Sequence, residues 1–177
     1  MLEGKNVNLR VMEKEDLPLL TEWENSLDYI SEYNPFRQRS RAEQERQYEK
    51  LGPDDKWFFI EKKDGSNIGV LMHFAVRGYS EIGYALVPKE RGKGYCTEAV
   101  QMMVDYLFLS KDVVRVQAET NVENTASQKV LEKAGFMKEG LLRKAAFIRG
   151  DWRDLFLYSI LREEWKEPKI LTRTEKK

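Results

Sequence analysis

The chain has 177 residues, 41% of them hydrophobic, and its 30 Lys and Arg residues balance 30 Asp and Glu residues. This length fits one domain, and the balanced charge gives no global argument for nucleic acid or a membrane as partner. The sequence has no apolar run near the roughly 18 residues of a transmembrane helix and no apolar signal region. Its single cysteine cannot form an internal disulfide. We therefore expect a cytoplasmic protein.

The first half of the chain shows alternating apolar residues and turn signals. It is predicted, in order, as a strand over 7–12, a helix over about 17–25, a polar helix over 41–51, and strands over 56–62, 67–76 and 81–87. Pro18 fits the first turn of its helix. Asp64-Gly65 and Arg77-Gly78 predict the turns that join the three strands into a meander.

The second half alternates helices and strands. It is predicted as an amphipathic helix over 97–109, a strand over 113–120, a helix over 124–133, an extended segment from 136, a turn at 149–151 and a strand over 155–161. The helix over 97–109 lies between two strands, which predicts a crossover unit. We expect a single domain over 1–165 and a charged, frayed tail over 166–177.

The loop before the long helix has the chemistry of an anion site. Gly92 and Gly94 alternate with the cations Lys89, Arg91 and Lys93. Glycine lets the backbone approach a ligand, and the N-terminus of a helix favours negative charge. The stretch therefore predicts a phosphate pocket, although the glycines alone also fit a plain tight turn.

Two segments carry a resemblance to a known family. Residues 88–95, PKERGKGY, resemble the acetyl-CoA pyrophosphate loop of the GNAT superfamily of N-acetyltransferases. Residues 121–127, NVENTAS, with 130–136, VLEKAGF, resemble its second acetyl-CoA segment. The family usually has Gln or Arg where this chain has Lys89, so a cation is retained there. The likeness runs over about 6–165.

The end of the chain narrows the resemblance. Residues 139–143, EGLLR, and 150–154, GDWRD, are similar to the RimJ/RimL-like branch, which acetylates N-terminal amines of ribosomal proteins and includes relatives that act on small amines. The resemblance implies an α+β fold of three layers. Its mixed, mostly antiparallel sheet would have about seven strands flanked by helices, with one splayed strand pair for acetyl-CoA.

The implied reaction is direct transfer of an acetyl group from acetyl-CoA to a primary amine. The acceptor would be a protein N-terminus or a small amine, with no metal, nucleic acid or membrane involved, and a homodimer is possible. The resemblance implies these acetyl-CoA contacts: Leu86, Val87, Arg91, Gly92, Lys93, Gly94, Tyr95, Cys96, Thr97, Asn121, Asn124 and Lys133. Asn124 also suits a helix N-cap, and Lys133 a solvated helix face.

Two side chains are candidates for the chemistry. Glu81 lies where the superfamily often has its catalytic glutamate, and a carboxylate can take the proton of the amine. It could equally face solvent at the start of its strand. Many relatives protonate the leaving thiolate with a Tyr at the position of Leu131. Here Ser127 is the candidate donor, and the alternative is a helical Ser bonded to its own backbone.

The acceptor side and the competing functions are less defined. Tyr33, Phe36 and Arg37 are candidates for the acceptor site because the family's early helices cover that side, and a solvated loop is the alternative. His73 is the single histidine, so no metal cluster or catalytic triad can be built around it. The competing function is a non-catalytic acyl-CoA-binding module. A nucleotide-binding protein is disfavoured, since no P-loop or third glycine is present.

Overall fold

The computed structural model describes residues 1–76 and 78–170. One eight-stranded sheet has the order β1-β2-β3-β4-β5-β6-β8-β7. The strands are β1 (Leu2–Glu3), β2 (Val7–Val11), β3 (Lys56–Lys62), β4 (Asn67–Val76), β5 (Tyr79–Leu86), β6 (Arg115–Asn121), β7 (Met137–Ile148) and β8 (Asp151–Leu161). β5 and β6 are parallel and the other neighbouring strands are antiparallel, which confirms the predicted mixed sheet.

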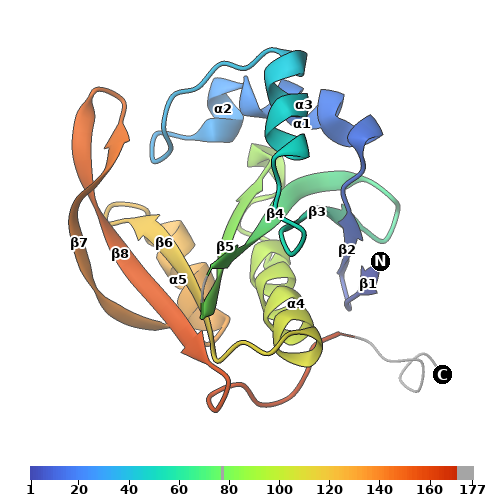
Figure 1. Ribbon diagram of the computed structural model, residues 1–177, viewed down its shortest axis with the longest axis vertical. Helices are drawn as coiled ribbons and strands as arrows, with labels where there is room; N and C mark the ends of the chain where they lie inside the picture. The colour runs from blue at the N-terminus through green and yellow to red at the C-terminus, as the bar shows by residue number, and fades with distance from the viewer. Residues whose placement is uncertain (77, 171–177) are drawn as a thin grey trace.

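The helices cover both faces of this sheet (Figure 1). They are α1 (Leu17–Glu24), α2 (Leu27–Ile30), α3 (Arg41–Glu49), α4 (Tyr95–Ser110) and α5 (Thr125–Lys133), with short 3-10 turns at Lys14–Asp16 and Pro88–Glu90. Phe58 and Ile60 of β3 pack in the cluster under α4, whereas Trp57 and Phe59 pack with α1 and α2. A strand buried on both faces explains the continuous apolar run of β3.

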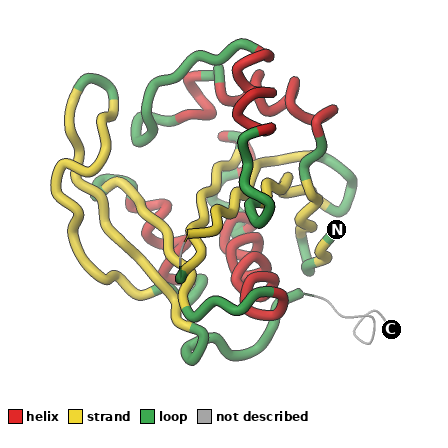
Figure 2. Tube along the Cα trace, in the orientation of Figure 1, coloured by secondary structure: helices red, strands yellow, loops and turns green. Residues whose placement is uncertain are grey.

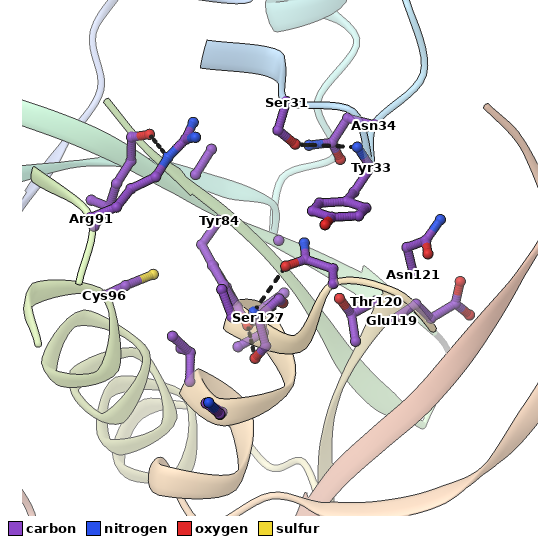
Figure 3. A pocket seen from close by; sticks show the side chains of 18 of the residues that line it. Ser31, Tyr33, Asn34, Tyr84, Arg91, Cys96, Glu119, Thr120, Asn121 and Ser127 are labelled. Carbon is purple, nitrogen blue, oxygen red and sulfur yellow. Dashed lines mark hydrogen bonds between the residues drawn. The ribbon is translucent and has the colours of Figure 1, made fainter. Parts of the chain in front are cut away.

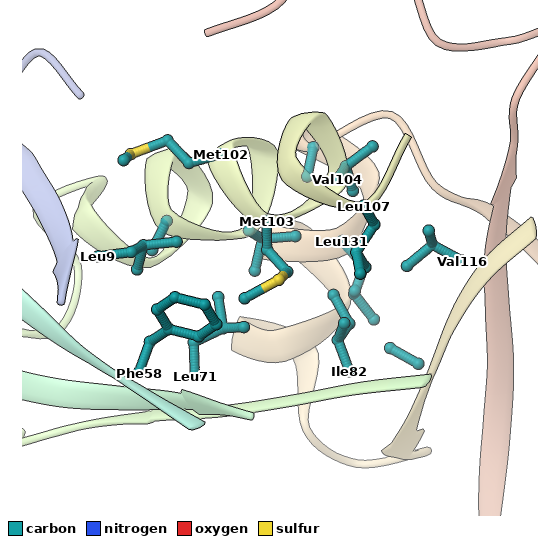
Figure 4. Packing of buried hydrophobic residues seen from close by; sticks show 14 of the residues in the cluster. Leu9, Phe58, Leu71, Ile82, Met102, Met103, Val104, Leu107, Val116 and Leu131 are labelled. Atoms are coloured by element: carbon teal, nitrogen blue, oxygen red, sulfur yellow. The ribbon is translucent and has the colours of Figure 1, made fainter. Parts of the chain in front are cut away.

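The long helix α4 is the centre of the larger core. Met103 and Leu107 are fully buried, and they pack over Phe58, Leu71 and Ile82 of the sheet (Figure 4). Each fully buried apolar side chain of this size contributes about 1.5–3 kcal/mol. α4 connects the parallel strands β5 and β6, which confirms the crossover unit. Its N-terminus therefore follows directly on the end of β5 and the glycine loop.

Some elements differ from the predictions. β1 and α2 were not expected, because runs of two and four residues show no periodicity. β6 begins at Arg115 rather than at residue 113, and Val114 is exposed. β5 begins at Tyr79, so Glu81 lies inside the strand. Arg77 of the predicted Arg77-Gly78 turn lies outside the described residues.

The C-terminal segment is held by a buried carboxylate on α4. Asp105 accepts hydrogen bonds from Trp165 Nε1 at 2.8 Å, from Ile170 N at 3.0 Å and from Lys169 N. This part of the predicted frayed tail is therefore attached, and residues 171–177 lie outside the described residues. No helix in the described part of the chain is long and apolar enough to cross a membrane.

Candidate functional site

The cavity lies where the two parallel strands separate. β5 and β6 pair at Ser80↔Val116 and Glu81↔Gln117, and the later residues of both strands line a cavity of about 580 Å³. The cavity is lined by Tyr29, Ser31, Tyr33, Asn34, Pro35, Ile82, Gly83, Tyr84, Ala85, Leu86, Arg91, Gly92, Gly94, Cys96, Thr97, Glu119, Thr120, Asn121, Asn124, Ala126, Ser127, Lys129, Val130, Lys133, Ala146, Ile148 and Leu155. The predicted splayed pair is therefore present.

The glycine loop forms one end of this cavity. Gly92 and Gly94 have φ angles of 76° and 87°, a region that favours glycine. Gly94 is the N-cap of α4, so the helix starts at Tyr95, two residues earlier than expected. The unpaired N–H groups of the first turn and the helix dipole make this end a site for an anion.

Two cations of the loop are bonded to other groups of the chain, and Arg91 also lines the cavity. Arg91 Nε donates to Leu86 O at 3.0 Å, and its NH2 group donates to Asp28 O at 3.1 Å and Tyr29 O at 2.9 Å. Lys93 Nζ bonds Glu90 Oε2 at 3.0 Å and does not line the cavity. Arg91 thus ties α2 to the end of β5.

Two further cations beside the loop come from α5. Lys129 and Lys133 both line the cavity, one helical turn apart on the same face. Neither ammonium group forms an ion pair with another residue in the part of the chain that the structure describes. They are therefore available for a phosphate ligand. Lys133 was a sequence candidate, and Lys129 was not.

Ser127 reaches the middle of the cavity from the first turn of α5 and meets Tyr84 of β5 (Figure 3). The Tyr84 hydroxyl lies 2.9 Å from Ser127 Oγ and 3.3 Å from Ser127 O. Burial raises the pKa of Tyr84 well above its ordinary value, so this hydroxyl stays neutral. Asn124 Oδ1 accepts from Ser127 N at 3.1 Å, which confirms Asn124 as the N-cap.

Two carboxylates lie near the fork between the strands. Glu81 is at its closed end, where Gln117 Nε2 donates to its Oε2 at 3.3 Å, and it is not among the lining residues. Glu119, two residues further along β6, lines the cavity. Desolvation raises the pKa of Glu119, and the negative charge of Glu81 raises it further. Glu119 is thus the carboxylate that faces the cavity, and sequence reasoning missed it.

The remaining candidates on the cofactor side fall into two groups. Asn121, Cys96, Thr97 and Leu86 line the cavity. Asn121 Oδ1 also accepts from Glu123 N at 2.8 Å, and burial raises the pKa of the Cys96 thiol to about 12. Val87 and Tyr95 do not line the cavity, and both pack against the core.

The wall opposite the loop is built from the segment after α2 and from the hairpin β7–β8. Of the three acceptor-site candidates, Tyr33 lines the cavity there, whereas Phe36 and Arg37 do not. The β7–β8 register shifts between Leu142 and Ala146, and beyond this irregularity Ala146 and Ile148 line the cavity. Bulges commonly re-aim side chains beside functional sites.

One further residue that lines the cavity, Tyr29, has a hydroxyl group without a hydrogen-bond partner in the described part of the chain. The Tyr29 hydroxyl is buried and has no partner among the described residues. Burial also raises the pKa of Tyr29, so the hydroxyl remains a neutral donor. A buried hydroxyl without a partner costs about 1–3 kcal/mol, which favours a ligand acceptor in this cavity.

Comparisons with known proteins identify the class. The profile "Acetyltransferase (GNAT) domain" matches residues 6–137. The chain is 34% identical to the "Probable N-acetyltransferase YjcK" of Bacillus subtilis, over 91% of this chain and 97% of the relative. It is 28% identical to the "Putative ribosomal N-acetyltransferase YdaF" of Bacillus subtilis, over 94% of this chain and 97% of the relative.

A solved structure has the same fold. The spermidine N-acetyltransferase from Vibrio cholerae in complex with CoA and spermine superposes with a TM-score of 0.81 at 24% identity, over 90% of this chain and 97% of that chain. The fold and the profile define an acetyltransferase. The chain belongs to the GNAT family and is an N-acetyltransferase.

Proposed function

We propose that this enzyme transfers the acetyl group directly to a primary amine that enters the cavity beside Glu119. The observation that carries the proposal is the shared cavity. Glu119, the Tyr84–Ser127 pair and the glycine loop all lie on its walls, on different elements. A base, a thiol-facing hydroxyl and an anion site are the groups that this transfer needs.

The residues present fit acetyl-CoA. The first turn of α4 after Gly94 suits the pyrophosphate, and Lys129 and Lys133 suit a further phosphate. Beyond Glu81, the edge of β5 that faces β6 is free of the ladder and can pair with the pantetheine amides. A backbone N–H of this edge can donate to the acetyl carbonyl, as oxyanion donors do. Leu86 and Tyr95 would contribute backbone N–H groups, whereas Val87 N donates to Ile68 O and Val87 O accepts from Glu90 N.

Glu119 is the favoured base. A primary ammonium must lose a proton before its nitrogen attacks the thioester carbon, and the raised pKa of Glu119 suits a proton acceptor. The proton passes to the carboxylate directly or through one water. Glu81 acts indirectly, since its negative charge raises the pKa of Glu119. If Glu81 itself took the proton, it would do so from the closed end of the fork, where β5 and β6 are still paired.

Ser127 would stabilise the leaving sulfur. When the C–S bond breaks, the electron pair stays on sulfur, and Ser127 Oγ–H can donate to it while Tyr84 O–H donates to Ser127 Oγ. The raised pKa of Tyr84 opposes loss of its proton. The pair therefore supplies hydrogen bonds rather than a net proton, and the second proton, which the nitrogen loses after its attack, passes to the thiolate sulfur or to water. A thiol has a pKa of about 8.5, so hydrogen bonds suffice until then.

The acceptor is a protein N-terminal amine or a small amine. The name of one relative refers to ribosomal N-acetylation, and the solved structure is of a spermidine N-acetyltransferase. Tyr29 and Tyr33 line the cavity and are candidates to contact ligand. We also propose a homodimer as the possible assembly.

The test is a panel of amines with acetyl-CoA, followed by detection of free thiol. The panel contains spermidine, alaninamide and peptides with free N-termini. Thiol release that depends on one class of amine supports transfer. Tight binding of acetyl-CoA without thiol release for any amine would favour the competing function, a non-catalytic acyl-CoA-binding module.

A further inference from the structure

Gly83 is a glycine that the fold itself does not require. It lies inside β5 and lines the cavity. Its φ angle is outside the left-handed region that favours glycine, and a Cβ atom at this position would meet no heavy atom within 4 Å. Gly69, on the neighbouring strand β4, is different, because a Cβ atom there would collide with the carbonyl oxygen of Ala85. Close packing therefore explains Gly69 but not Gly83.

A glycine without such a reason weakens the strand that contains it. Glycine loses more conformational freedom on folding than any other residue, and it has no side chain to pack. Inside a strand it often marks a place where a ligand or another backbone approaches closely. Among the described residues, only the chain neighbours of Gly83 lie within 4 Å of its Cβ position. The space beside this residue is therefore left for a ligand.

The open side of Gly83 is the side of the sheet that carries Glu119. Successive side chains of a strand point to opposite faces of the sheet. Ile82 of β5 and Ala118 of β6 both pack in the core cluster under α4. Gly83 and Glu119, which follow them in the two strands, therefore face the other side of the sheet.

The register of the parallel strands also sets Gly83 level with Glu119. Glu81 and Gln117 form the last pair before the two strands separate. Two residues further along each strand, Gly83 and Glu119 lie on the two sides of the fork, and both line the cavity. The loop after α2, drawn in green in Figure 2, contributes Tyr33 to the same cavity. An amine that gives its proton to Glu119 therefore has the bare backbone of Gly83 beside it.

We propose that Gly83 is a specificity-determining residue, which leaves room for a substituent on the carbon atom that carries the acceptor amine. This proposal rests on the proposed function, in which Glu119 takes the proton of that amine. A side chain at position 83 would occupy this room and exclude the substituent. The enzyme with glycine here accepts an amine on a branched carbon, as in the N-terminal residue of a peptide, as well as one on an unbranched carbon.

Two amines that differ by a single methyl group test this role. Alaninamide has a methyl group on the carbon next to its amine, and glycinamide has none. Gly83→Ala puts a methyl group into the same space, and the variant should fold because the added Cβ atom meets nothing within 4 Å. For the protein loaded with CoA, we expect the Kd of alaninamide to rise roughly tenfold and that of glycinamide to stay within about twofold, since one such group in a pocket is worth about 10–200-fold. Titration followed by nuclear magnetic resonance measures both values.

Gly140→Ala is the matched control. Gly140 also lies inside a strand, β7, its φ angle is also outside the left-handed region, and a Cβ atom there would also meet nothing within 4 Å. It does not line the cavity. The control therefore separates the effect of a filled space from the effect of a stiffer strand, and it should leave both Kd values unchanged.

The outcomes separate this proposal from the proposed function. A wild-type protein that does not bind alaninamide overturns the role of Gly83. So does a Gly83→Ala variant that keeps its affinity for alaninamide, that loses affinity for both amides equally, or that behaves as Gly140→Ala does. The expected shift in Kd without acetyl transfer to any amine of the panel supports the role of Gly83 and contradicts the proposed function. Acetyl transfer to both amides with the same preference in wild type and Gly83→Ala does the reverse.

Discussion

The hydroxyl of Tyr84, on β5, lies 2.9 Å from the hydroxyl of Ser127, on α5. The contact joins residues 43 positions apart. It decides how Ser127 can act, because only when Tyr84 donates to Ser127 Oγ does the serine proton remain free for the cavity. When Tyr84 donates to Ser127 O instead, at 3.3 Å, its oxygen accepts the serine proton.

Removal of this hydrogen bond should slow the reaction without weakening cofactor binding. We expect Tyr84→Phe and Ser127→Ala each to lower kcat by roughly tenfold to a hundredfold, the worth of one or two hydrogen bonds. The double variant should resemble Ser127→Ala, because the residues act as a unit. Steady-state kinetics of the four proteins measures this, and additive losses would contradict it.

Glu81→Gln should shift the pH profile rather than abolish activity. The charge of Glu81 helps to raise the pKa of Glu119, so a neutral Gln lowers that pKa. Glu119 then stays deprotonated at lower pH, and the acid limb of kcat/KM moves to lower pH. The control is Glu22→Gln, at an exposed site on α1. Loss of turnover at every pH would make Glu81 itself the base.

The cations of α5 should contribute more to CoA affinity than Lys93 of the loop. Lys129→Gln and Lys133→Gln each remove an ammonium that lines the cavity, and a hydrogen bond to a charged group is worth about 1.5–3 kcal/mol, at least roughly tenfold in Kd. Lys93→Gln removes an ammonium that is bonded to Glu90, so its Kd for CoA should stay within about twofold. Calorimetric titration with CoA compares the three, and a larger loss for Lys93→Gln would refute this assignment.

Lys129 is thus added to the sequence candidate Lys133, whereas Arg91, which also lines the cavity, and Lys93 are bonded to other parts of the chain. The alternation of Gly92, Gly94 and the basic residues predicted the loop correctly, because turn geometry is local. The engagement of Arg91 with Asp28 O and Tyr29 O depends on contacts more than 60 residues away, which no local pattern encodes.

The contrast between local patterns and long-range contacts also holds for the rest of the fold and the site. Asn124 was predicted as an N-cap from its place before a helix, whereas Tyr84 and Glu119 emerge only when β5 and β6 are set side by side. An alternation test would have placed Glu119 on one face of its strand, but not beside a cavity. The strand predicted from residue 113 begins at Arg115, and the apolar Val114 that suggested the earlier start is exposed.

Asp105 should contribute strongly to stability. Its buried carboxylate accepts from Trp165, Lys169 and Ile170, so Asp105→Ala leaves these donors unpaired or releases the segment. We expect a loss of about 1–3 kcal/mol in the free energy of unfolding. Urea denaturation followed by tryptophan fluorescence measures it, with Asp112→Ala, at an exposed site after α4, as the control. Equal midpoints for Asp105→Ala and wild type would show that this contact is not required.

The most direct test of the account is the turnover of Glu119→Gln with the best acceptor of the amine panel, measured together with its affinity for CoA. General-base catalysis is worth about 10²–10⁴ in rate, so kcat should fall by that factor while the Kd for CoA stays within about twofold. Turnover within twofold of wild type, at unchanged CoA affinity, would contradict the assignment of Glu119 as the base.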